Sequence, residues 1–249
     1  MTKIVATIQA RMGSSRLPEK VMKKIGNKTV IEVLVERLSY SKFIDKICVS
    51  TTKSKKDDKF VKYLKLKKIE YFRGSENNVL SRVSNTLKYL NADIHVECFG
   101  DSPLIDHRII DKNIKYFLKN NYNVVTNTLK TTFPPGSEFL IYKSSDLIKL
   151  NQLVKQKDKL REHVGYNFTR FKNFNIKSIN AVKNYRYPNY YIEIDKKEDL
   201  KVVRKICKNF KNYKFSLLEI IKFLKKNKKL VEFNSKVQRR WKSLRYEKN

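Results

Sequence analysis

The sequence predicts an α/β fold in which a mostly parallel β-sheet carries helices on both faces. Over about the first 130 residues, segments rich in apolar and β-branched residues alternate five times with segments of helical spacing. Parallel strands must be joined by crossovers, and these are usually helices, so the alternation indicates a parallel sheet. Ligands bind such sheets at the carboxyl ends of the strands, and we therefore look for chemistry in the loops that follow them.

The elements of this first part follow from periodicity. Short, apolar, β-branched runs predict strands at 4–8, 46–50, 69–72, 94–99 and 124–126. Between them, apolar residues recur every three or four positions, as on one face of a helix, at 30–38, 60–64, 79–90 and 105–118.

Past residue 130 the pattern becomes less regular. Further strands are predicted at 139–142, 176–181 and 189–194, and helices at 144–154, 158–171, from about 196 and at 215–227. Residues 228–249 show no clear periodicity. Neither an internal repeat nor a linker divides the chain, so we expect one domain over 1–227 and a basic C-terminal extension over 228–249.

The charge of the chain first suggests a nucleic-acid-binding protein. Its 249 residues include 56 Lys+Arg and 24 Asp+Glu, a formal net charge of +32. Residues 211–249 hold 13 basic and 3 acidic residues, or +10, and the other +22 is spread over 1–210. Because Lys is rarely buried, most of this charge is interpreted as solvated surface, and no nucleic-acid partner is expected.

Other classes of protein are excluded by composition. No apolar run approaches the roughly 20 residues that cross a bilayer, so no membrane insertion is expected. The N-terminus does not read as a signal peptide. The three cysteines are widely spaced and do not form a disulfide framework or a zinc motif with His. We expect a cytoplasmic protein.

The loop after the first strand is a candidate phosphate-binding loop. Residues 9–20 read QARMGSSRLPEK, in which Gly13 allows close approach of a ligand, and Ser14 and Ser15 offer hydroxyl and N–H groups. Arg suits bidentate contacts to phosphate, and Lys supplies a point charge. The cations of the loop are Arg11, Arg16 and Lys20. The pattern is neither GxxxxGK[ST] nor GxGxxG, and a solvated basic loop is the alternative.

Two aspartates follow predicted strands and are candidate ligands of Mg²⁺. Asp101 comes just after the strand at 94–99, and Asp195 just after the strand at 189–194. Mg²⁺ prefers such hard oxygen ligands and keeps waters and substrate phosphates. A structural alternative stands for each aspartate. Asp101 could flank a helix that starts with Ser102 as its cap, and Asp195 could itself cap a helix, with Glu198 completing a capping box.

The phosphate loop resembles the signature of the cytidylyltransferases related to the CMP-KDO and CMP-sialate synthetases. The likeness is greatest to the spore-coat polysaccharide biosynthesis branch, whose loop reads QARMGSSRLPGKV, with Gly where this chain has Glu19. Further runs match in order. They are FRGSENNVL at 72–80, with Ser81 in place of an Asp just beyond it, GDSPLID at 100–106, TNTL at 126–129, REHV at 161–164 and YIEIDKKEDL at 191–200.

The resemblance, which covers about residues 3–227, implies a three-layer αβα fold of the nucleotide-diphospho-sugar transferase (GT-A-like) type. It implies transfer of CMP from CTP to an acidic sugar or related small acceptor, with release of pyrophosphate, in the synthesis of surface polysaccharide precursors. Residues 1–130 would form the nucleotide-binding half, and 131–227 the half that binds the acceptor and completes the metal site. Mg²⁺ is the expected cofactor, and a homodimer is an option.

The resemblance also distributes roles over this chain. Asp101 and Asp195 would hold Mg²⁺, and the catalytic residues would be Arg11, Arg16, Lys20 and Asp101. The predicted nucleotide-binding residues are Gln9, Ala10, Arg11, Gly13, Ser14, Ser15, Arg16, Lys20, Ser75, Val79, Arg82 and Asp101. The predicted acceptor-binding residues are Asn127, Glu138, Arg161 and His163.

One run departs from the family pattern on the acceptor side. The family's PDGLDVEVF appears here as PGSEFLIY at 135–142, so Glu138 replaces an Asp and Leu140 falls where a Glu is expected. Two alternative functions stay open from the sequence. One is a nucleotidyltransferase that uses another nucleoside triphosphate, and the other is a basic nucleic-acid-binding protein, which would bind with a steep dependence on salt.

Overall fold

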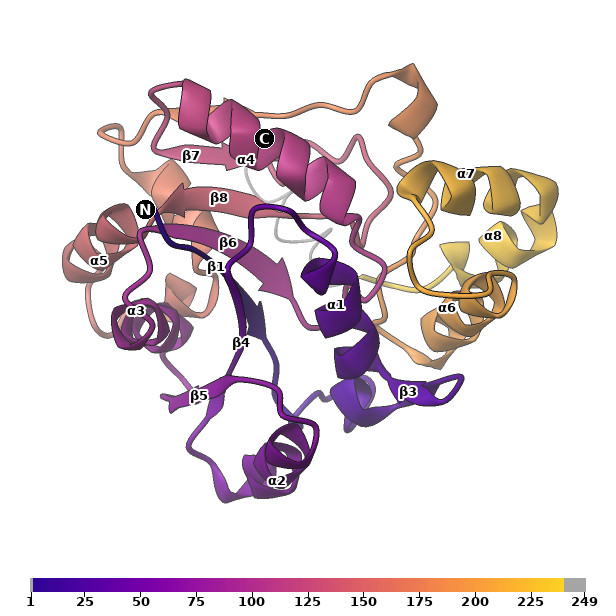
Figure 1. The fold of residues 1–249 in the computed structure, drawn as a ribbon, viewed down its shortest axis with the longest axis horizontal. Coiled ribbons are helices and arrows are strands. Elements are labelled where there is room, and N and C mark those ends of the chain that lie inside the picture. Colours follow the sequence, from indigo (N-terminus) through magenta and orange to yellow (C-terminus); the bar gives the residue numbers. More distant parts are fainter. Residues whose placement is uncertain (1, 240–249) are drawn as a thin grey trace.

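The computed structural model describes residues 2–239 and shows the predicted α/β architecture (Figure 1). One sheet contains the strands β1 (Ile4–Gln9), β4 (Lys46–Thr52), β5 (Tyr71–Gly74), β6 (Ile94–Phe99), β7 (Val124–Thr126), β8 (Leu140–Lys143) and β9 (Ile176–Ser178). Their order is β5-β4-β1-β6-β8-β7-β9. Strand β8 runs antiparallel to β6 and β7, and the other strand pairs of this sheet are parallel. A two-stranded ribbon pairs β2 (Lys24–Ile25) with β3 (Lys28–Thr29).

Helices cover both faces of the sheet. The α-helices are α1 (Val30–Ser39), α2 (Asp58–Leu66), α3 (Val79–Tyr89), α4 (His107–Lys119), α5 (Ser144–Leu153), α6 (Lys197–Lys208), α7 (Leu217–Lys226) and α8 (Lys228–Ser235). Helices α1, α2 and α4 share one core cluster with the central strands, and α3 and α5 share another. Helices α6, α7 and α8 pack together at one end of the molecule (Figure 1).

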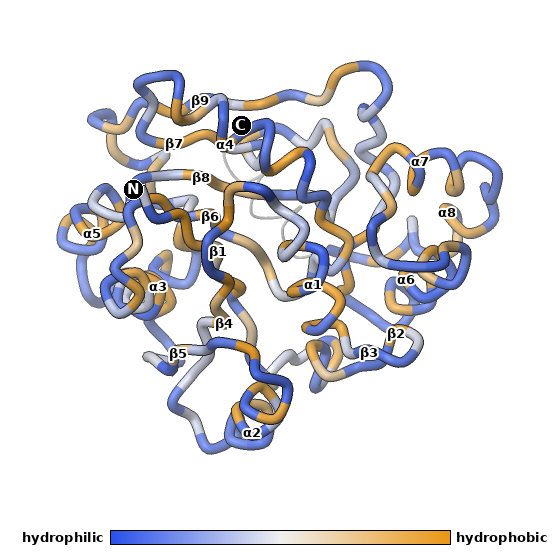
Figure 2. The backbone as a smooth tube through the Cα atoms, viewed as in Figure 1, coloured by the Kyte–Doolittle hydropathy of each residue, from blue (hydrophilic) through white to orange (hydrophobic). Residues whose placement is uncertain are grey.

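The two central strands are buried on both faces, as the parallel arrangement requires. In β1, Ile4, Ala6 and Ile8 belong to the core beneath α1, α2 and α4. The side chains of His95 and Glu97 on β6 alternate with the core residues of that strand and are also buried. The second face therefore contains polar side chains at its centre. Figure 2 shows that most hydrophobic residues lie in the inner strands and on one side of the surrounding helices.

The least regular part of the sequence contains the errors of prediction. No strand forms at 189–194, where the chain makes isolated hydrogen bonds instead of a ladder. The helix predicted at 158–171 is two short 3₁₀ helices, η3 (Lys159–Glu162) and η4 (Gly165–Arg170). Helix α8 lies within the stretch that showed no periodicity, because eight residues give too few turns to reveal a pattern.

Three further 3₁₀ helices complete the described elements: η1 (Lys20–Met22), η2 (Lys55–Asp57) and η5 (Lys183–Tyr185). Among residues 2–239, none of the helices combines the length and the apolar character that crossing a membrane would require.

Candidate active site

The carboxyl ends of β1 and β6 lie side by side and carry the first two parts of the site. Gln9 pairs with Phe99 at the end of the ladder. The phosphate loop follows Gln9, and Asp101 follows two residues after Phe99. The N–H of Gly100 donates to the Gln9 carbonyl oxygen at 3.1 Å, and a Cβ at Gly100 would come within 2.6 Å of that oxygen. A glycine is therefore required where the two strand ends meet.

The third part of the site comes from the segment at 192–195, far away in sequence. The N–H of Ile194 donates to the Asp101 carbonyl oxygen at 2.7 Å, and Ile192 and Glu193 both donate to Pro135. Gly136 has a φ of +104°, and a Cβ there would come within 2.4 Å of the Glu193 nitrogen. These contacts bring Asp195 to the same rim as Asp101, although the segment is not a strand of the sheet.

Lys20 lies between the two aspartates. Its Nζ is 3.2 Å from Asp101 Oδ2 and 3.4 Å from Asp195 Oδ1, while Arg16 Nη1 is 3.0 Å from the other oxygen of Asp195. The Lys20 and Asp195 side chains are 9% and 3% exposed, and the Asp101 side chain is 36% exposed. The predicted convergence of the two carboxylates is present, with Asp101 on the open side of the group.

The capping alternatives for both aspartates are wrong. Helix α4 begins six residues after Asp101, and its N-terminal cap is Asp106, whose side chain accepts from Arg108 N–H. At the other position, Lys196 precedes helix α6, and Asp199 accepts from the N–H groups of both Asp195 and Lys196. The carboxylates of Asp101 and Asp195 are therefore directed to Lys20 and Arg16, and neither serves a helix end.

The donor set fits Mg²⁺. Two carboxylates share one rim, and a cation, Lys20 Nζ, already bridges them. Mg²⁺ is commonly bound through one or two carboxylates and completes its shell with waters and substrate phosphates. In the described part of the chain, three or more His, Cys, Asp or Glu side chains do not gather into a metal-binding group. Substrate oxygens would therefore have to supply further ligands.

A buried aspartate holds the backbone of the phosphate loop on its inner side, and the outer side of the loop is exposed. Asp57, on η2, accepts from the Met12 N–H at 2.7 Å and from the Thr52 hydroxyl, and it is almost fully buried. A Cβ built at Gly13 would meet nothing within 4 Å. Gly13, Ser15 and Arg16 are exposed, and Ser14 is half-buried. The loop therefore presents a glycine, two serines and a cation to a ligand from a fixed backbone.

The departure from the family pattern at Glu19 falls on a strained position. Glu19 has φ +55° and ψ +29°, the left-handed region that favours glycine. Its carboxylate is 3.4 Å from Lys59 Nζ, which is a largely exposed pair. Glycine at this position would adopt the same turn without strain, which explains why the related loop has Gly.

Three of the predicted nucleotide-binding residues, Ser75, Val79 and Arg82, lie within or just before the first turn of α3. Arg82 is 3% exposed and donates to the Ser75 carbonyl oxygen at 2.6 Å, and its side chain packs on Gly74. Burial, and then the charge of Arg11, lower the pKa of Arg82 to about 10. Arg11 itself lies 3.6 Å from Glu162 on η3. Two arginines thus share this side of the loop, with Val79 buried beside them.

Gln9 continues into a buried polar network beneath the strand ends. Its Nε2 donates to Glu97 Oε1 at 2.6 Å, and the Tyr142 hydroxyl donates to Glu97 Oε2 at 2.8 Å. Burial raises the pKa of Glu97 to about 7, against the lowering effect of these hydrogen bonds and that of Gly165 N–H. Glu97 pairs in register with Leu140 on β8, so a carboxylate lies next to the position where the family pattern has Glu.

Two of the four predicted acceptor residues, Asn127 and Glu138, belong to the turn between β7 and β8, whose Pro135 and Gly136 contact the segment that carries Asp195. The Asn127 side chain donates to Ser137 O and accepts from Phe139 N–H, which fixes the turn between β7 and β8. Glu138 accepts from the Gly136 N–H at 2.7 Å. Burial, followed by the charges of Glu138 and Asp101, raises the pKa of Glu193. These carboxylates therefore lie close enough to one another to interact electrostatically.

The geometry does not support Arg161 as an acceptor-binding residue. Its side chain is buried and makes four hydrogen bonds, to the side chain of Asn78, the carbonyl and side-chain oxygens of Asn151 and the carbonyl oxygen of Val154. Arg161 thus ties the segment after α5 to the start of α3. His163, half-buried at the end of η3, donates its N–H to Leu160 O.

Four residues around the site were missed from the sequence: Asp57, Glu97, Asp199 and Arg239. Asp199 lies in the matched run at 191–200, and an acidic residue in the first turn of a helix is a recognisable signal. The others carry no local signal. Arg239 in particular lies in the expected extension, yet its side chain is fully buried against Glu193 and Asp199.

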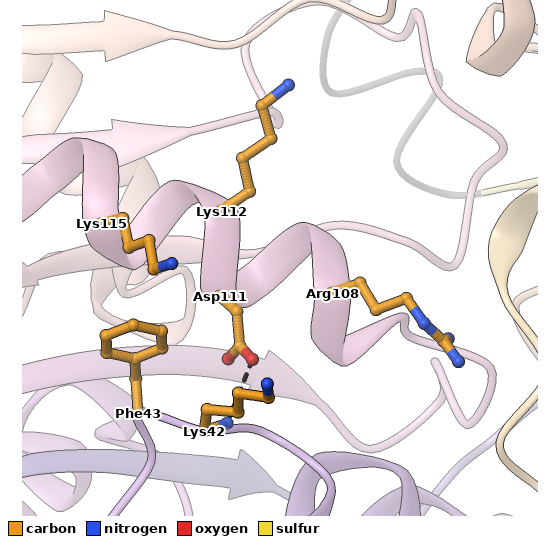
Figure 3. Close-up of a pocket in the computed structure, with 6 residues that line it drawn as sticks. All are labelled: Lys42, Phe43, Arg108, Asp111, Lys112 and Lys115. Carbon is orange, nitrogen blue, oxygen red and sulfur yellow. Dashed lines mark hydrogen bonds between the residues drawn. The ribbon is translucent and has the colours of Figure 1, made fainter.

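A hollow of about 310 Å³ lies between α4 and the loop at 42–43 and does not belong to this site (Figure 3). It is lined by Lys42, Phe43, Arg108, Asp111, Lys112 and Lys115. Asp111 is already bonded to the Ser41 hydroxyl and the Lys42 N–H, and the cations point in different directions (Figure 3). No convergent set of polar groups forms there.

Comparison with known proteins places these features in a family. The cytidylyltransferase family model matches residues 5–236. A cytidylyltransferase structure from Leptospira borgpetersenii is 32% identical, covers 96% of this chain and 100% of its own, and superposes with a TM-score of 0.88. The spore coat polysaccharide biosynthesis protein SpsF of Bacillus subtilis is 28% identical over 82% of this chain and 86% of its own length.

A more distant structure shows the fold alone. The CMP:2-keto-3-deoxy-manno-octonic acid synthetase complexed with CTP is 17% identical, covers 84% of this chain and 99% of its own, and has a TM-score of 0.65. The match of the family model over nearly the whole described chain is decisive. This chain belongs to the cytidylyltransferase family and is a nucleotidyltransferase.

Proposed function

We propose that the protein transfers CMP from CTP to an acidic sugar or a related small acceptor and releases pyrophosphate. One observation carries the proposal: Lys20 and Arg16 of an open phosphate loop meet the carboxylates of Asp101 and Asp195 at the carboxyl ends of the central strands. Cations that suit a triphosphate are thus in direct contact with carboxylates that suit Mg²⁺.

The reaction is an in-line displacement at the α-phosphorus of CTP. An oxygen of the acceptor forms the new bond, the bond to the β-phosphate oxygen breaks, and pyrophosphate leaves with that electron pair. If the attacking group is a hydroxyl, its proton goes to solvent. The protein needs no covalent intermediate, so its work is to position the reactants and neutralise charge.

The side chains divide this work. Arg11, Arg16 and Lys20 would hold the triphosphate and stabilise the leaving pyrophosphate, while Gly13, Ser14 and Ser15 offer it backbone and hydroxyl groups. Asp101 and Asp195 would hold Mg²⁺, which when bound supplies positive charge to the phosphate oxygens. Gln9, Ala10, Ser75, Val79 and Arg82 are proposed to form the cytidine pocket.

The acceptor is proposed to bind beside Asn127 and Glu138. The relative SpsF is named for spore coat polysaccharide biosynthesis, and we propose that this chain likewise supplies a precursor of surface polysaccharide. Since CTP is a cytoplasmic metabolite, the reaction would take place in the cytoplasm. The scattered Lys residues give a basic surface that attracts anionic substrates in general.

Pyrophosphate release tests the proposal. The protein is incubated with CTP, Mg²⁺ and a panel of acidic sugars, with ATP, GTP and UTP in parallel. We expect release with CTP and at least one acidic acceptor, and thermal stabilisation by CTP with Mg²⁺. The proposal is contradicted if no acceptor supports turnover and CTP does not stabilise the protein. A preference for ATP, GTP or UTP would instead make the protein a nucleotidyltransferase for that nucleotide.

A further inference from the structure

We propose that the C-terminal arm, residues 227–239, is a positioning element of the active site, in which Arg239 acts through Asp199 to hold Asp195 in place. The arm comprises α8 and the residues that follow it to Arg239. The inference rests on the proposed role of Asp195 as a ligand of Mg²⁺, and it gives a function to a stretch that the sequence marked only as a basic extension.

The first step is the contact between Asp199 and the backbone at Asp195. Asp199 Oδ2 accepts from the Asp195 N–H and from the Lys196 N–H, both at 2.9 Å. Asp199 is fully buried. Because the segment at 192–195 lacks the ladder of a strand, these two bonds take its place in fixing the backbone that carries the Asp195 carboxylate.

The second step joins Asp199 to the arm. Arg239 Nη2 donates to Asp199 Oδ1 at 2.8 Å, and Asn234 Nδ2 donates to the same oxygen at 2.9 Å. Asp199 therefore accepts from the active-site backbone with Oδ2 and from the arm chiefly with Oδ1, and Arg239 Nη1 makes a longer contact of 3.5 Å to Oδ2. A carboxylate held on both sides by charge-assisted bonds has a fixed orientation.

The third step places the arm on the other side of Asp195 as well. Arg239 Nη1 donates to Glu193 Oε1 at 2.9 Å, and its guanidinium lies 3.9 Å from the centre of the Tyr191 ring. Asn234 Nδ2 also contacts the Tyr191 carbonyl oxygen at 3.1 Å. The arm thus contacts residues 191 and 193, which precede Asp195, and residue 199, which follows it.

This arrangement depends on the planar, forked guanidinium group of Arg239. It bridges two carboxylates that stand four and two residues from Asp195, and its side chain is fully buried. A lysine at 239 would retain the charge but could not serve both carboxylates with the same geometry. Purely apolar packing of the arm would need neither the charge nor the fork.

The test compares Arg239→Met and Arg239→Lys with the natural protein. The first readout is native-state hydrogen exchange at the Asp195 and Lys196 amides, measured by NMR. The second is Mn²⁺ affinity by EPR, with Mn²⁺ as the probe of the metal site. The third is the separation of kcat from KM for CTP. Leu64→Ala, which truncates a buried side chain of α2 outside the core cluster of α6 and α7, is the control for a general loss of stability.

In Arg239→Met we expect faster exchange at both amides and weaker Mn²⁺ binding, by roughly 10- to 100-fold, as for other residues that support metal ligands. The effect on turnover should fall on kcat more than on KM for CTP, because the phosphate loop is untouched. Arg239→Lys should be intermediate. Leu64→Ala should leave the Mn²⁺ affinity unchanged, and exchange at the Asp195 and Lys196 amides should be no faster, relative to the amides of α6, than in the natural protein.

Unchanged exchange at both amides and unchanged Mn²⁺ affinity in a folded Arg239 variant would overturn the inference and leave the proposed function standing. If Arg239→Met does not fold, Arg239→Lys and Asp199→Asn decide by the same readouts. If the natural protein neither binds Mn²⁺ nor turns over CTP, the proposed function fails, while the exchange data still show whether the arm holds the backbone at Asp195.

Discussion

The two aspartates at the centre of the site reach it in different ways. Asp101 lies two residues beyond β6, a strand held on both sides by ladders to β1 and β8. Asp195 lies in a segment without a ladder, and single contacts from Pro135, Asp101 and Asp199 place it. The first position is set by the sheet, whereas the second is assembled from three distant parts of the chain.

The rim of the candidate site thus combines a half that is fixed by the sheet with a half that is assembled from distant segments. The sheet half holds the phosphate loop and is open to solvent, with Asp101 36% exposed. The assembled half is buried, with Asp195 only 3% exposed and paired to Arg16 and Lys20. The same substitution should therefore have different consequences on the two sides.

Replacing each aspartate by asparagine is the strongest test of this difference. Both variants should lose turnover by about 10²-fold or more, because each replaces a carboxylate that is proposed to hold Mg²⁺, and Mg²⁺ supplies the positive charge at the phosphate oxygens. Asp101→Asn should change the free energy of unfolding by about 1 kcal/mol, because the carboxylate lies on the solvent side of its pair with Lys20 and Lys20 retains Asp195 as a partner. Asp195→Asn breaks a buried pair and should cost about 3 kcal/mol. Pyrophosphate release and urea unfolding measure the two effects, and equal stability losses would contradict the comparison.

Glu97→Gln probes the buried polar face beneath the rigid half. The pKa of Glu97 is about 7 in the folded protein against an ordinary value of 4.5, so the folded state binds more protons across this window. The contribution of Glu97 to stability is thus present at low pH and lost as the pH rises to about 7, by roughly 3 kcal/mol. The difference in free energy of unfolding between Glu97→Gln and the natural protein should therefore move by this amount in favour of the variant as the pH rises from 4.5 to 8.

His95, on the same strand, opposes this trend. Burial lowers its pKa to about 3, so its contribution is present above its ordinary value of 6.5 and lost as the pH falls. The Glu97→Gln variant keeps the His95 dependence and lacks that of Glu97, so its stability relative to the natural protein should rise from pH 4.5 to 6.5. Urea unfolding at several pH values measures this dependence. If the free energies of unfolding of the two proteins change in parallel with pH, the pKa of Glu97 is not raised.

Gly13→Ala separates ligand binding from folding within the phosphate loop. The added Cβ would meet no atom within 4 Å, and the φ of Gly13 lies outside the left-handed region. We expect unfolding unchanged within about 0.5 kcal/mol. Binding of CTP should weaken about tenfold if a phosphate oxygen approaches this backbone, a loss of about 1.4 kcal/mol. Calorimetric titration with CTP measures it, and unaltered affinity would place the triphosphate elsewhere.

The smallest expected effect is a stabilisation by Glu19→Gly. Relief of the left-handed conformation, offset by the entropy of glycine, should raise the free energy of unfolding by roughly 0.5 kcal/mol. That corresponds to a melting temperature higher by about 1–2 °C. Lys59→Ala is the matched control, since it removes the exposed pair with Glu19 and should leave stability nearly unchanged. A loss of stability in Glu19→Gly would mean that the carboxylate contributes more than the strain costs.

The sequence predicted those features whose signals are local. The buried strands at the centre of the sheet, the helices α1, α3 and α4, and the loop at 9–20 all follow from short-range periodicity or from a contiguous motif. Prediction failed where local and tertiary preferences diverge. The β-branched run at 189–194 reads as a strand, but Gly136 and Pro135 lie against it and give it only isolated hydrogen bonds.

The candidate site residues show the same division between what local sequence predicts and what the tertiary structure decides. From their place after strands, Asp101 and Asp195 could equally have capped helices, and only the fold shows both carboxylates meeting Lys20. Arg161 matched a family run and yet is engaged by Asn78, Asn151 and Val154. Arg161 in its matching motif thus has a packing role, because a motif fixes identity and spacing but not the direction in which a side chain points.

The sequence by itself determined the α/β class, the phosphate loop and the resemblance to cytidylyltransferases, because each depends on residues that are neighbours along the chain. The tertiary structure decided which charges meet. Arg239 lies 40 residues from Asp199 and shows no pattern of its own, yet it is buried against it. Electrostatic pairing depends on distance in space, and the folded chain alone sets that distance.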